Sequence, residues 1–365
     1  MSEISQAQAE AALAAYTDPY LNTDLISAGC VRDISIDSTN FIRVSIHLDY
    51  PSEFLKDGIA QLLQTALENI DGCSGAEVKI SWDVQPSGHH SDLEAIAQVK
   101  NIIAIASGKG GVGKSTTAVN LAIALAKDGA KVGLLDADIY GPSQGIMLGV
   151  ADGTHPQTID NKWFVPIEAY GIKSMSMAYL VTENTPMVWR GPMVAGALIQ
   201  IMTQTQWGEL DYLIVDMPPG TGDIQLTMGQ KFPVAGAVIV TTPQDIALAD
   251  ARKGVEMFRK VNIPVLGMIE NMSMHICSQC GHAEHIFGEE GAERLAEEYH
   301  TEVLGSLPLS KYIREQSDDG TPVVADDDCS EVSMMYRHAA RRMAVALARL
   351  NQQGNRIPDI EISDD

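Results

Sequence analysis

The spacing of apolar residues divides the chain into two parts. In the first part, residues 5–16 and 52–70 have the apolar spacing of amphipathic helices. Segments that alternate apolar and polar residues accompany these helices and predict strands with one buried face. The alternating segments are residues 42–48 and 78–84. We therefore predict a small α+β domain over residues 1–85, followed by a linker over 86–100 that opens with loop-forming Pro, Ser, Gly and His residues.

From Asn101 onward the pattern changes to short apolar runs separated by longer helical stretches. The runs are residues 102–106, 132–135, 212–215, 237–240, 265–269 and 303–307. Strands that are apolar on both faces and alternate with helices indicate a mostly parallel sheet covered by helices on both faces. We therefore predict an α/β domain over residues 101–352, which ends in a helix over about 331–351, and an acidic tail over 353–365.

Charge and composition narrow the class of protein. Lys and Arg total 25 and Asp and Glu total 48, which gives a formal net charge of −23. So acidic a surface repels phosphate backbones and anionic lipid head groups, and this argues against nucleic acid or a membrane as the main partner. No apolar run reaches the roughly 18 residues of a spanning helix, and the first residues lack the regions of a signal peptide. We therefore expect a cytoplasmic protein.

A glycine-rich loop between the first apolar run and a helix start carries the clearest chemistry. The segment SGKGGVGKSTT fits the P-loop pattern G-x-x-x-x-G-K-[ST]. Backbone N–H groups of such a loop, and the helix N-terminus behind it, converge on phosphate oxygens. Lys114 is expected to reach the β- and γ-phosphates of ATP, and the Ser115 hydroxyl to ligate Mg²⁺. The predicted nucleotide-binding loop consists of Gly108, Lys109, Gly110, Gly111, Val112, Gly113, Lys114, Ser115 and Thr116.

The lysine at the second position of this loop, Lys109, is unusual for a P-loop. The stretch KGGVGKS resembles the deviant Walker A motif of the ParA, MinD, ArsA and nitrogenase iron-protein group. That resemblance implies a homodimer that encloses ATP at its interface. Lys109 would reach the partner's nucleotide and stabilise transition-state charge in trans, as an arginine finger does.

The same resemblance implies roles for residues after three later strands. Asp138, in LLDADIYGPS, stands where the group has a switch I aspartate that positions or activates the attacking water, and Asp136 is a second carboxylate there. Asp216, in YLIVDMPPGTGD, corresponds to a Walker B carboxylate that holds Mg²⁺ through water, with switch II following at 220–223. Asn271 resembles the adenine-contacting asparagine of the group.

Cys277 and Cys280 form a C-x-x-C, the only closely spaced pair among five cysteines. Two thiolates on one short turn fill two metal positions, and a twofold dimer would supply four. Four thiolates are the ligand set of a bridging [4Fe–4S] cluster or of a tetrahedral zinc. Two alternatives remain open: a structural zinc, completed within one chain by His282 and His285 or across the dimer, and a redox disulfide.

The region from about 95 to 350 resembles the Mrp/ApbC family of iron–sulfur cluster carrier ATPases. The matching stretches are SGKGGVGKST, LLDADIYGPS, WRGPM, WGELDYLIVDMPPGTGD, TTPQDIALAD and ENMS-x3-C-x2-C-G. The resemblance implies slow ATP hydrolysis coupled to the loading or transfer of a [4Fe–4S] cluster. A homodimer would hold the cluster, receive it from donor proteins and deliver it to apo iron–sulfur proteins. The alternative is a ParA/MinD-like positioning ATPase with a structural zinc at the cysteine pair.

The N-terminal part resembles the iron–sulfur assembly P domain that is often fused to these proteins, through DPYLNTDLISAGCV. It departs from that domain in one place. Many such domains carry a cysteine near a proline after the second strand, where this chain has YPSEF. The departure argues against a metal role for this domain, and we interpret Cys30 and Cys73 as small apolar fillers.

Overall fold

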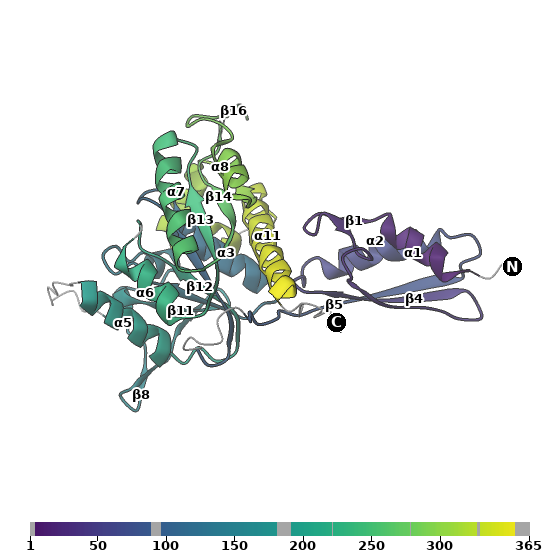
Figure 1. Ribbon diagram of the computed structural model, residues 1–365, viewed down its shortest axis with the longest axis horizontal. Helices are drawn as coiled ribbons and strands as arrows, with labels where there is room; N and C mark the ends of the chain where they lie inside the picture. The colour runs from purple at the N-terminus through teal and green to yellow at the C-terminus, as the bar shows by residue number, and fades with distance from the viewer. Residues whose placement is uncertain are drawn as a thin grey trace, which may run out of the picture. The chain divides into compact units, whose positions relative to one another are not determined.

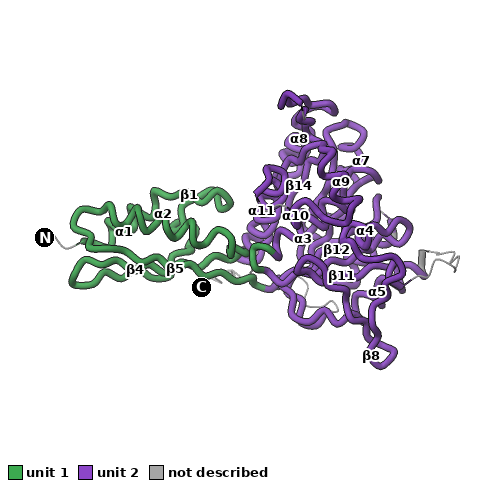
Figure 2. The backbone as a smooth tube through the Cα atoms, turned by 180° about the vertical axis from the view of Figure 1, so that it is seen from behind, with its two compact units in different colours: residues 1–85, 127–129 green, residues 86–126, 130–365 purple. Residues whose placement is uncertain are grey.

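The computed structural model describes residues 4–88, 96–180, 191–220, 222–277, 279–326 and 329–354. The chain forms two compact units, one made of residues 1–85 with 127–129 and the other of residues 86–126 with 130–365 (Figure 2). Some predicted features lie outside the described residues: 89–95 of the linker, Trp189 and Arg190 of WRGPM, Thr221 of switch II, and the tail from 355 onward.

The smaller unit is built around a three-stranded sheet (Figure 1). β3 (Val31–Ile36) pairs antiparallel with β4 (Phe41–Leu48), and β4 pairs parallel with β5 (Gly75–Trp82). The crossover between the parallel strands is α2 (Lys56–Glu68), which packs against β5 and against α1 (Gln6–Ala14). A short hairpin, β1 (Thr17–Asp18) and β2 (Thr23–Asp24), precedes the sheet. Alternate residues of β4 are buried, as their apolar character predicts: Ile42, Val44, Ile46 and Leu48.

The larger unit contains an eight-stranded sheet in the order β10-β11-β7-β12-β6-β13-β14-β17. All pairs are parallel except β10 with β11. The strands are β6 (Val99–Ala106), β7 (Val132–Asp136), β10 (Ile167–Ala169), β11 (Ile172–Ser176), β12 (Leu210–Asp216), β13 (Val234–Thr241), β14 (Val265–Glu270) and β17 (Val303–Ser306). The predicted mostly parallel sheet is therefore confirmed.

Helices cover both faces of this sheet (Figure 1). One face shares a single buried apolar cluster with α5 (Gly191–Gln204), α6 (Asp223–Lys231), α7 (Asp245–Lys260) and α8 (Gly291–Tyr299). The opposite face carries α3 (Lys114–Lys127) and α11 (Glu331–Gly354), and α11 packs against β17 and β14. Shorter helices are α4 (Gln144–Met147), α9 (Lys311–Asp318) and α10 (Val323–Asp326). No helix among the described residues is long and apolar enough to cross a membrane.

The structure adds strands that the apolar pattern does not reveal. β3 is an edge strand that pairs on one side only, with three apolar and three polar residues, none of them fully buried. β10 and β11 form a tight hairpin at the other sheet's edge, where Tyr170 and Gly171 both have positive φ (50° and 78°). Two positive-φ residues in succession suit a type I′ turn, which joins twisted antiparallel strands. A second short hairpin pairs β8 (Thr158–Ile159) with β9 (Trp163–Phe164).

Candidate functional site

The carboxyl ends of three adjacent parallel strands bring the predicted nucleotide site together. β12 lies between β6 and β7, and the P-loop follows β6 directly. Asp216 at the end of β12 is the register partner of Asp136 at the end of β7. Because ligands of open α/β sheets bind outside the carboxyl ends of the strands, this arrangement places both carboxylates beside the phosphate-binding loop.

Two glycines of the P-loop are required by close contacts. A Cβ on Gly108 would lie 2.2 Å from the backbone carbonyl atoms of Asp250 in α7, so only glycine allows this approach. Gly113 has a φ of +82°, and a Cβ there would lie 2.1 Å from Nδ2 of Asn271. Gly111 also has a positive φ of 82°. The loop conformation therefore depends on glycine for both backbone dihedrals and packing.

Lys114 is held inside the site by the carboxylate of Asp216. Its ammonium donates to Oδ1 of Asp216 and to Oγ of Ser115, the latter at 3.1 Å. The side chain of Lys114 is 6% exposed and that of Asp216 is 0% exposed. The amide of Gln144 donates to the other Asp216 oxygen at 2.8 Å and to the Ser115 carbonyl at 3.0 Å. The predicted phosphate-binding lysine and the predicted Walker B carboxylate are thus ion-paired.

Asp136 is a buried carboxyl surrounded by hydrogen-bond donors. Its oxygens accept from the backbone N–H groups of Asp138, Ser143 and Gln144 at 3.0–3.2 Å, and from the Ser176 hydroxyl at 3.1 Å. Burial, together with the nearby charge of Asp216, raises the pKa of Asp136 to about 7. Asp136 therefore orders the loop after β7, which positions Asp138.

Of the three catalytic candidates, Lys114 is buried, whereas Lys109 and Asp138 are only partly buried. Oδ1 of Asp138 accepts from the N–H of Gly141 at 3.2 Å. The Lys109 carbonyl accepts from the Ser107 hydroxyl at 2.9 Å. Within the described part of the chain, no carboxylate lies within 4.0 Å of the Lys109 ammonium. The Lys109 ammonium can therefore pair with a negatively charged group of another molecule.

Asn271 connects the P-loop to a cavity beside it. Its Nδ2 donates to the Val112 carbonyl at 2.9 Å, and the side chain lines a cavity of about 370 Å³. Thr116, Leu309 and Arg314 are among the other lining residues. Gly113 also lines the cavity, which therefore adjoins the P-loop.

The predicted cysteine ligands lie at the tip of a hairpin made by β15 (His275–Ile276) and β16 (Ala283–Glu284). The Cys277 N–H donates to the His282 carbonyl and the Gly281 N–H to the Cys277 carbonyl, both at 2.9 Å. Cys277 is partly exposed, Cys280 is exposed, and neither forms a disulfide. Backbone N–H groups of Gln279 and Cys280 lower the pKa of the Cys277 thiol below its ordinary value. Such a thiol is suited to bind metal as the thiolate.

The hairpin does not bring a histidine to this pair. Neither Cys277 nor Cys280 belongs to a described group of three or more His, Cys, Asp or Glu side chains whose ligand atoms lie within 4.8 Å of one another. Nδ1 of His285 instead faces the Ser273 carbonyl at 2.8 Å. Among the described residues, neither His282 nor His285 therefore forms a three-ligand group with the two cysteines.

Sequence reasoning missed several residues that organise the site. Gln144 and Ser176 have no motif of their own, although Gln144 follows closely behind the LLDADIYGPS stretch. Gln225 was also missed. Its amide donates to the carbonyls of Pro218 and Gly220 at 2.8 and 3.0 Å and holds the start of switch II. The side chain of Asp223 lies outside the described residues.

Comparison with known proteins relates both units to iron–sulfur families. The family profile described as NUBPL iron-transfer P-loop NTPase matches residues 98–344. The profile described as iron–sulfur cluster assembly protein matches residues 6–80. These two matches cover the α/β unit and most of the smaller unit, respectively.

Individual relatives extend over most of the chain. The iron–sulfur cluster carrier protein of Pseudomonas fragi is 64% identical over 279 residues, which is 76% of this chain and 97% of the relative. The iron–sulfur cluster carrier protein of Escherichia coli (strain K12) is 48% identical over 367 residues and 98% of both chains. Among solved structures, a nucleotide-binding protein from Archaeoglobus fulgidus in complex with ADP matches with a TM-score of 0.56 and 37% identity, over 65% of this chain and 91% of that chain.

Proposed function

Because the chain belongs to the family of NUBPL iron-transfer P-loop NTPases, we propose that it is an iron–sulfur cluster carrier that binds and hydrolyses ATP. In this proposal two copies of the chain hold a [4Fe–4S] cluster and deliver it to apo iron–sulfur proteins. The observation that carries the proposal is the pair of free thiols, the partly exposed Cys277 and the exposed Cys280, on a chain that also has a P-loop. The two carrier proteins named above as relatives support it.

The nucleotide site has the groups that ATP hydrolysis requires. Lys114 would exchange Asp216 for the β- and γ-phosphates, and the freed carboxylate would hold the water shell of Mg²⁺ ligated by Ser115. Asp138 would orient the attacking water. Lys109 of one copy would approach the γ-phosphate in the other and stabilise the charge that develops there. Asn271 and the cavity it lines would take the adenine.

The cysteine hairpin has the properties of a site for a transferable cluster. Two thiols per chain provide half of the four ligands that a [4Fe–4S] cluster takes, so two copies complete the site. The thiols stand on an exposed turn with a lowered Cys277 pKa, so thiolates form readily and a client protein can reach the cluster. Slow ATP hydrolysis would change the geometry between the copies and thereby couple to loading or release.

The experiment that tests the proposal is the iron, acid-labile sulfide and zinc content of protein purified and reconstituted without oxygen. We expect about four iron and four sulfide per two chains. Cys277→Ser and Cys280→Ser should each lose this content, whereas Cys329→Ser, which removes another exposed cysteine, should keep it. Stoichiometric zinc without sulfide, lost in the same two variants, would refute the carrier proposal in favour of a structural metal.

A positioning ATPase of the MinD type would share the nucleotide site but would need a surface for nucleic acid or membrane. The net charge of −23 opposes both surfaces. Co-sedimentation with DNA or with anionic liposomes in the presence of ATP separates the two functions. The carrier proposal expects no saturable binding to either, and saturable binding would contradict it.

A further inference from the structure

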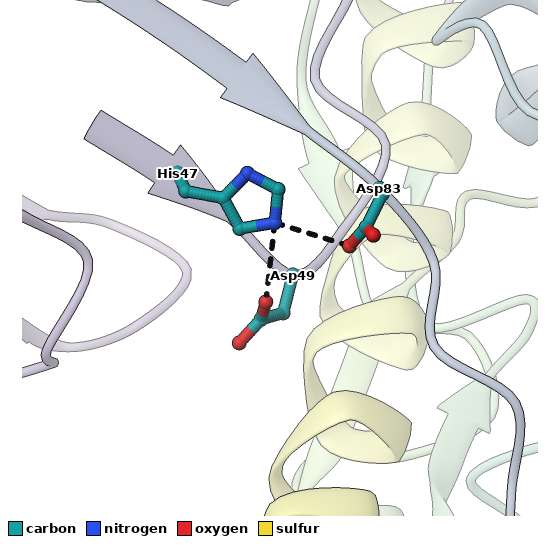
Figure 3. A group of neighbouring side chains, drawn as sticks. All are labelled: His47, Asp49 and Asp83. Atoms are coloured by element: carbon teal, nitrogen blue, oxygen red, sulfur yellow. Dashed lines mark hydrogen bonds and ion pairs between the residues drawn. The ribbon is translucent and has the colours of Figure 1, made fainter. Parts of the chain in front are cut away.

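The smaller unit carries a cluster of metal-binding side chains that involves no cysteine. The cluster consists of His47, Asp49 and Asp83 (Figure 3). One ligand atom from each residue lies within 4.8 Å of the other two. Among the described residues, this is the only group of three or more His, Cys, Asp or Glu side chains that are so close together. The three side chains are partly exposed, so solvent and ions can reach them.

Strand register explains how the cluster forms. β4 and β5 are parallel neighbours in which His47 is the partner of Ser81. Because side chains alternate between faces, His47 and Ser81 lie on the sheet face opposite the buried Ile46 and Leu48. An aspartate directly follows each strand: Asp49 follows β4 and Asp83 follows β5. Each stands two positions after His47 or Ser81, in the patterns H-x-D and S-x-D, and therefore continues the same face. Two short polar patterns, 34 positions apart, are thus brought side by side.

Hydrogen bonds fix which imidazole nitrogen faces the carboxylates. The Ser81 hydroxyl lies within hydrogen-bond distance of the Ile46 carbonyl, at 3.2 Å, and of Nδ1 of His47, at 3.0 Å, and so orients the ring. Nε2 then faces Oδ1 of Asp83 at 3.1 Å and Oδ1 of Asp49 at 3.7 Å. With its proton on Nδ1, the neutral imidazole presents the lone pair of Nε2 beside two carboxylate oxygens, and these three atoms together form a donor set for a metal cation.

The geometry points to a metal: we propose that His47, Asp49 and Asp83 bind a divalent transition-metal ion such as Zn²⁺ or Fe²⁺. Neighbouring ligand atoms of a tetrahedral zinc are separated by about 3.3 Å, given metal–ligand bonds of about 2.0–2.2 Å, close to the two distances from Nε2. The two carboxylates balance the ion's charge, and the imidazole selects against Mg²⁺ and Ca²⁺, which prefer oxygen. Exposure of the cluster leaves further coordination positions for water or a partner's ligand.

Outer hydrogen bonds of the kind that support metal ligands are already present. Ser81 orients the imidazole, and the Gln85 amide donates to the second oxygen of Asp83 at 2.7 Å. The absence of a cysteine from YPSEF argued against a metal role for this domain, but that argument considered thiolate ligands only. A histidine–carboxylate site uses none.

The test is titration calorimetry of the full chain with Zn²⁺, in a Cys277→Ser, Cys280→Ser background that removes the competing thiols. One Zn²⁺ should bind per chain. His47→Gln, Asp49→Asn and Asp83→Asn should each weaken binding by about tenfold or more, whereas Glu77→Gln, which removes a carboxylate from the same face of β5, should not. Ser81→Ala keeps all three ligands but should weaken affinity by roughly 10- to 100-fold, the usual effect of losing an outer-shell partner.

Two results would overturn the proposal. No Zn²⁺ binding in the background chain, or binding that His47→Gln leaves unchanged, would show that the cluster is only a histidine hydrogen-bonded beside two carboxylates. If the variants do not fold by circular dichroism, the ring protons of His47 are followed by NMR in the background chain as Co²⁺ is added. Paramagnetic shifts of that ring at one equivalent support the site, and unshifted resonances refute it. This proposal is independent of the carrier function, which rests on Cys277 and Cys280.

Discussion

The ion pair between Lys114 and Asp216 predicts that removing the carboxylate strengthens nucleotide binding in the absence of metal. Both groups are buried, and the ammonium that should bind the phosphates is already bonded to Asp216. Nucleotide must therefore break this pair before Lys114 can contact it. In Asp216→Asn the competing charge is absent, and the amide oxygen can still accept from Gln144, which donates at 2.8 Å in the native protein.

The magnitude follows from the energy of the contact. A hydrogen bond to a charged group contributes roughly 1.5–3 kcal/mol, which corresponds to about 10- to 150-fold in affinity. We expect Mg²⁺-free ATP to bind the variant tighter by that factor. Removing one partner of a buried pair costs about 3–5 kcal/mol of unfolding free energy, so the apo variant should be less stable. Hydrolysis with Mg²⁺ should be lost, because no carboxylate remains to hold the metal's water shell.

The assay is fluorescent-nucleotide binding in excess EDTA, with stability from urea unfolding. The matched control is Asp211→Asn, at the amino-terminal end of the same strand. There Asp211 accepts from the Lys100 ammonium and from the Lys131 N–H, each at 2.8 Å, far from the P-loop end of β12. The control should lose stability without a change in nucleotide affinity. Equal or weaker binding by Asp216→Asn in EDTA would show that the pair does not compete with phosphate.

Three further expectations concern the same site. Lys109→Ala should keep ATP affinity but lower kcat a hundredfold or more, as loss of an arginine finger does; unchanged turnover would remove Lys109 from the mechanism. Gly113→Ala should abolish nucleotide binding, because its Cβ would collide with Asn271 at a φ of +82°, whereas Gly110→Ala, whose nearest contact would be at 4.0 Å, should fold with native stability in urea. Because the pKa of Asp136 is raised, the folded apo protein keeps a proton on this carboxyl that the unfolded chain releases above about pH 4. The free energy of unfolding should therefore fall by a few kcal/mol as the pH rises from about 4 to 7. Urea titrations should show that Asp136→Asn flattens this dependence.

The fold was predictable where a strand is buried on both faces. The runs within β6, β12 and β13 are apolar at every position over 102–106, 212–215 and 237–240, because a central strand of a covered parallel sheet meets helices on each side. β3 and β10 were not predicted, because both are edge strands without a fully buried residue and neither shows a sustained apolar pattern. The other edge strands, β5 and β17, were predicted, since β5 alternates apolar and polar residues and β17 lies in an apolar run. The fold class could therefore be read from the sequence, whereas two of the outer strands could not.

The residues of the site also differ in how far the sequence alone predicts them. A P-loop is local, since its glycines, lysine and serine act within one turn of chain, so the sequence itself displays it. Contacts that close the site are not local: Gln144 is 72 positions from Asp216, and Asn271 is 159 positions from Val112. The cluster at His47 is hidden further, because its two halves meet only if β4 and β5 pair in the observed register. A shift of one residue would turn one strand's polar side chains to the buried face, so the cluster exists in the fold and in no single stretch of sequence.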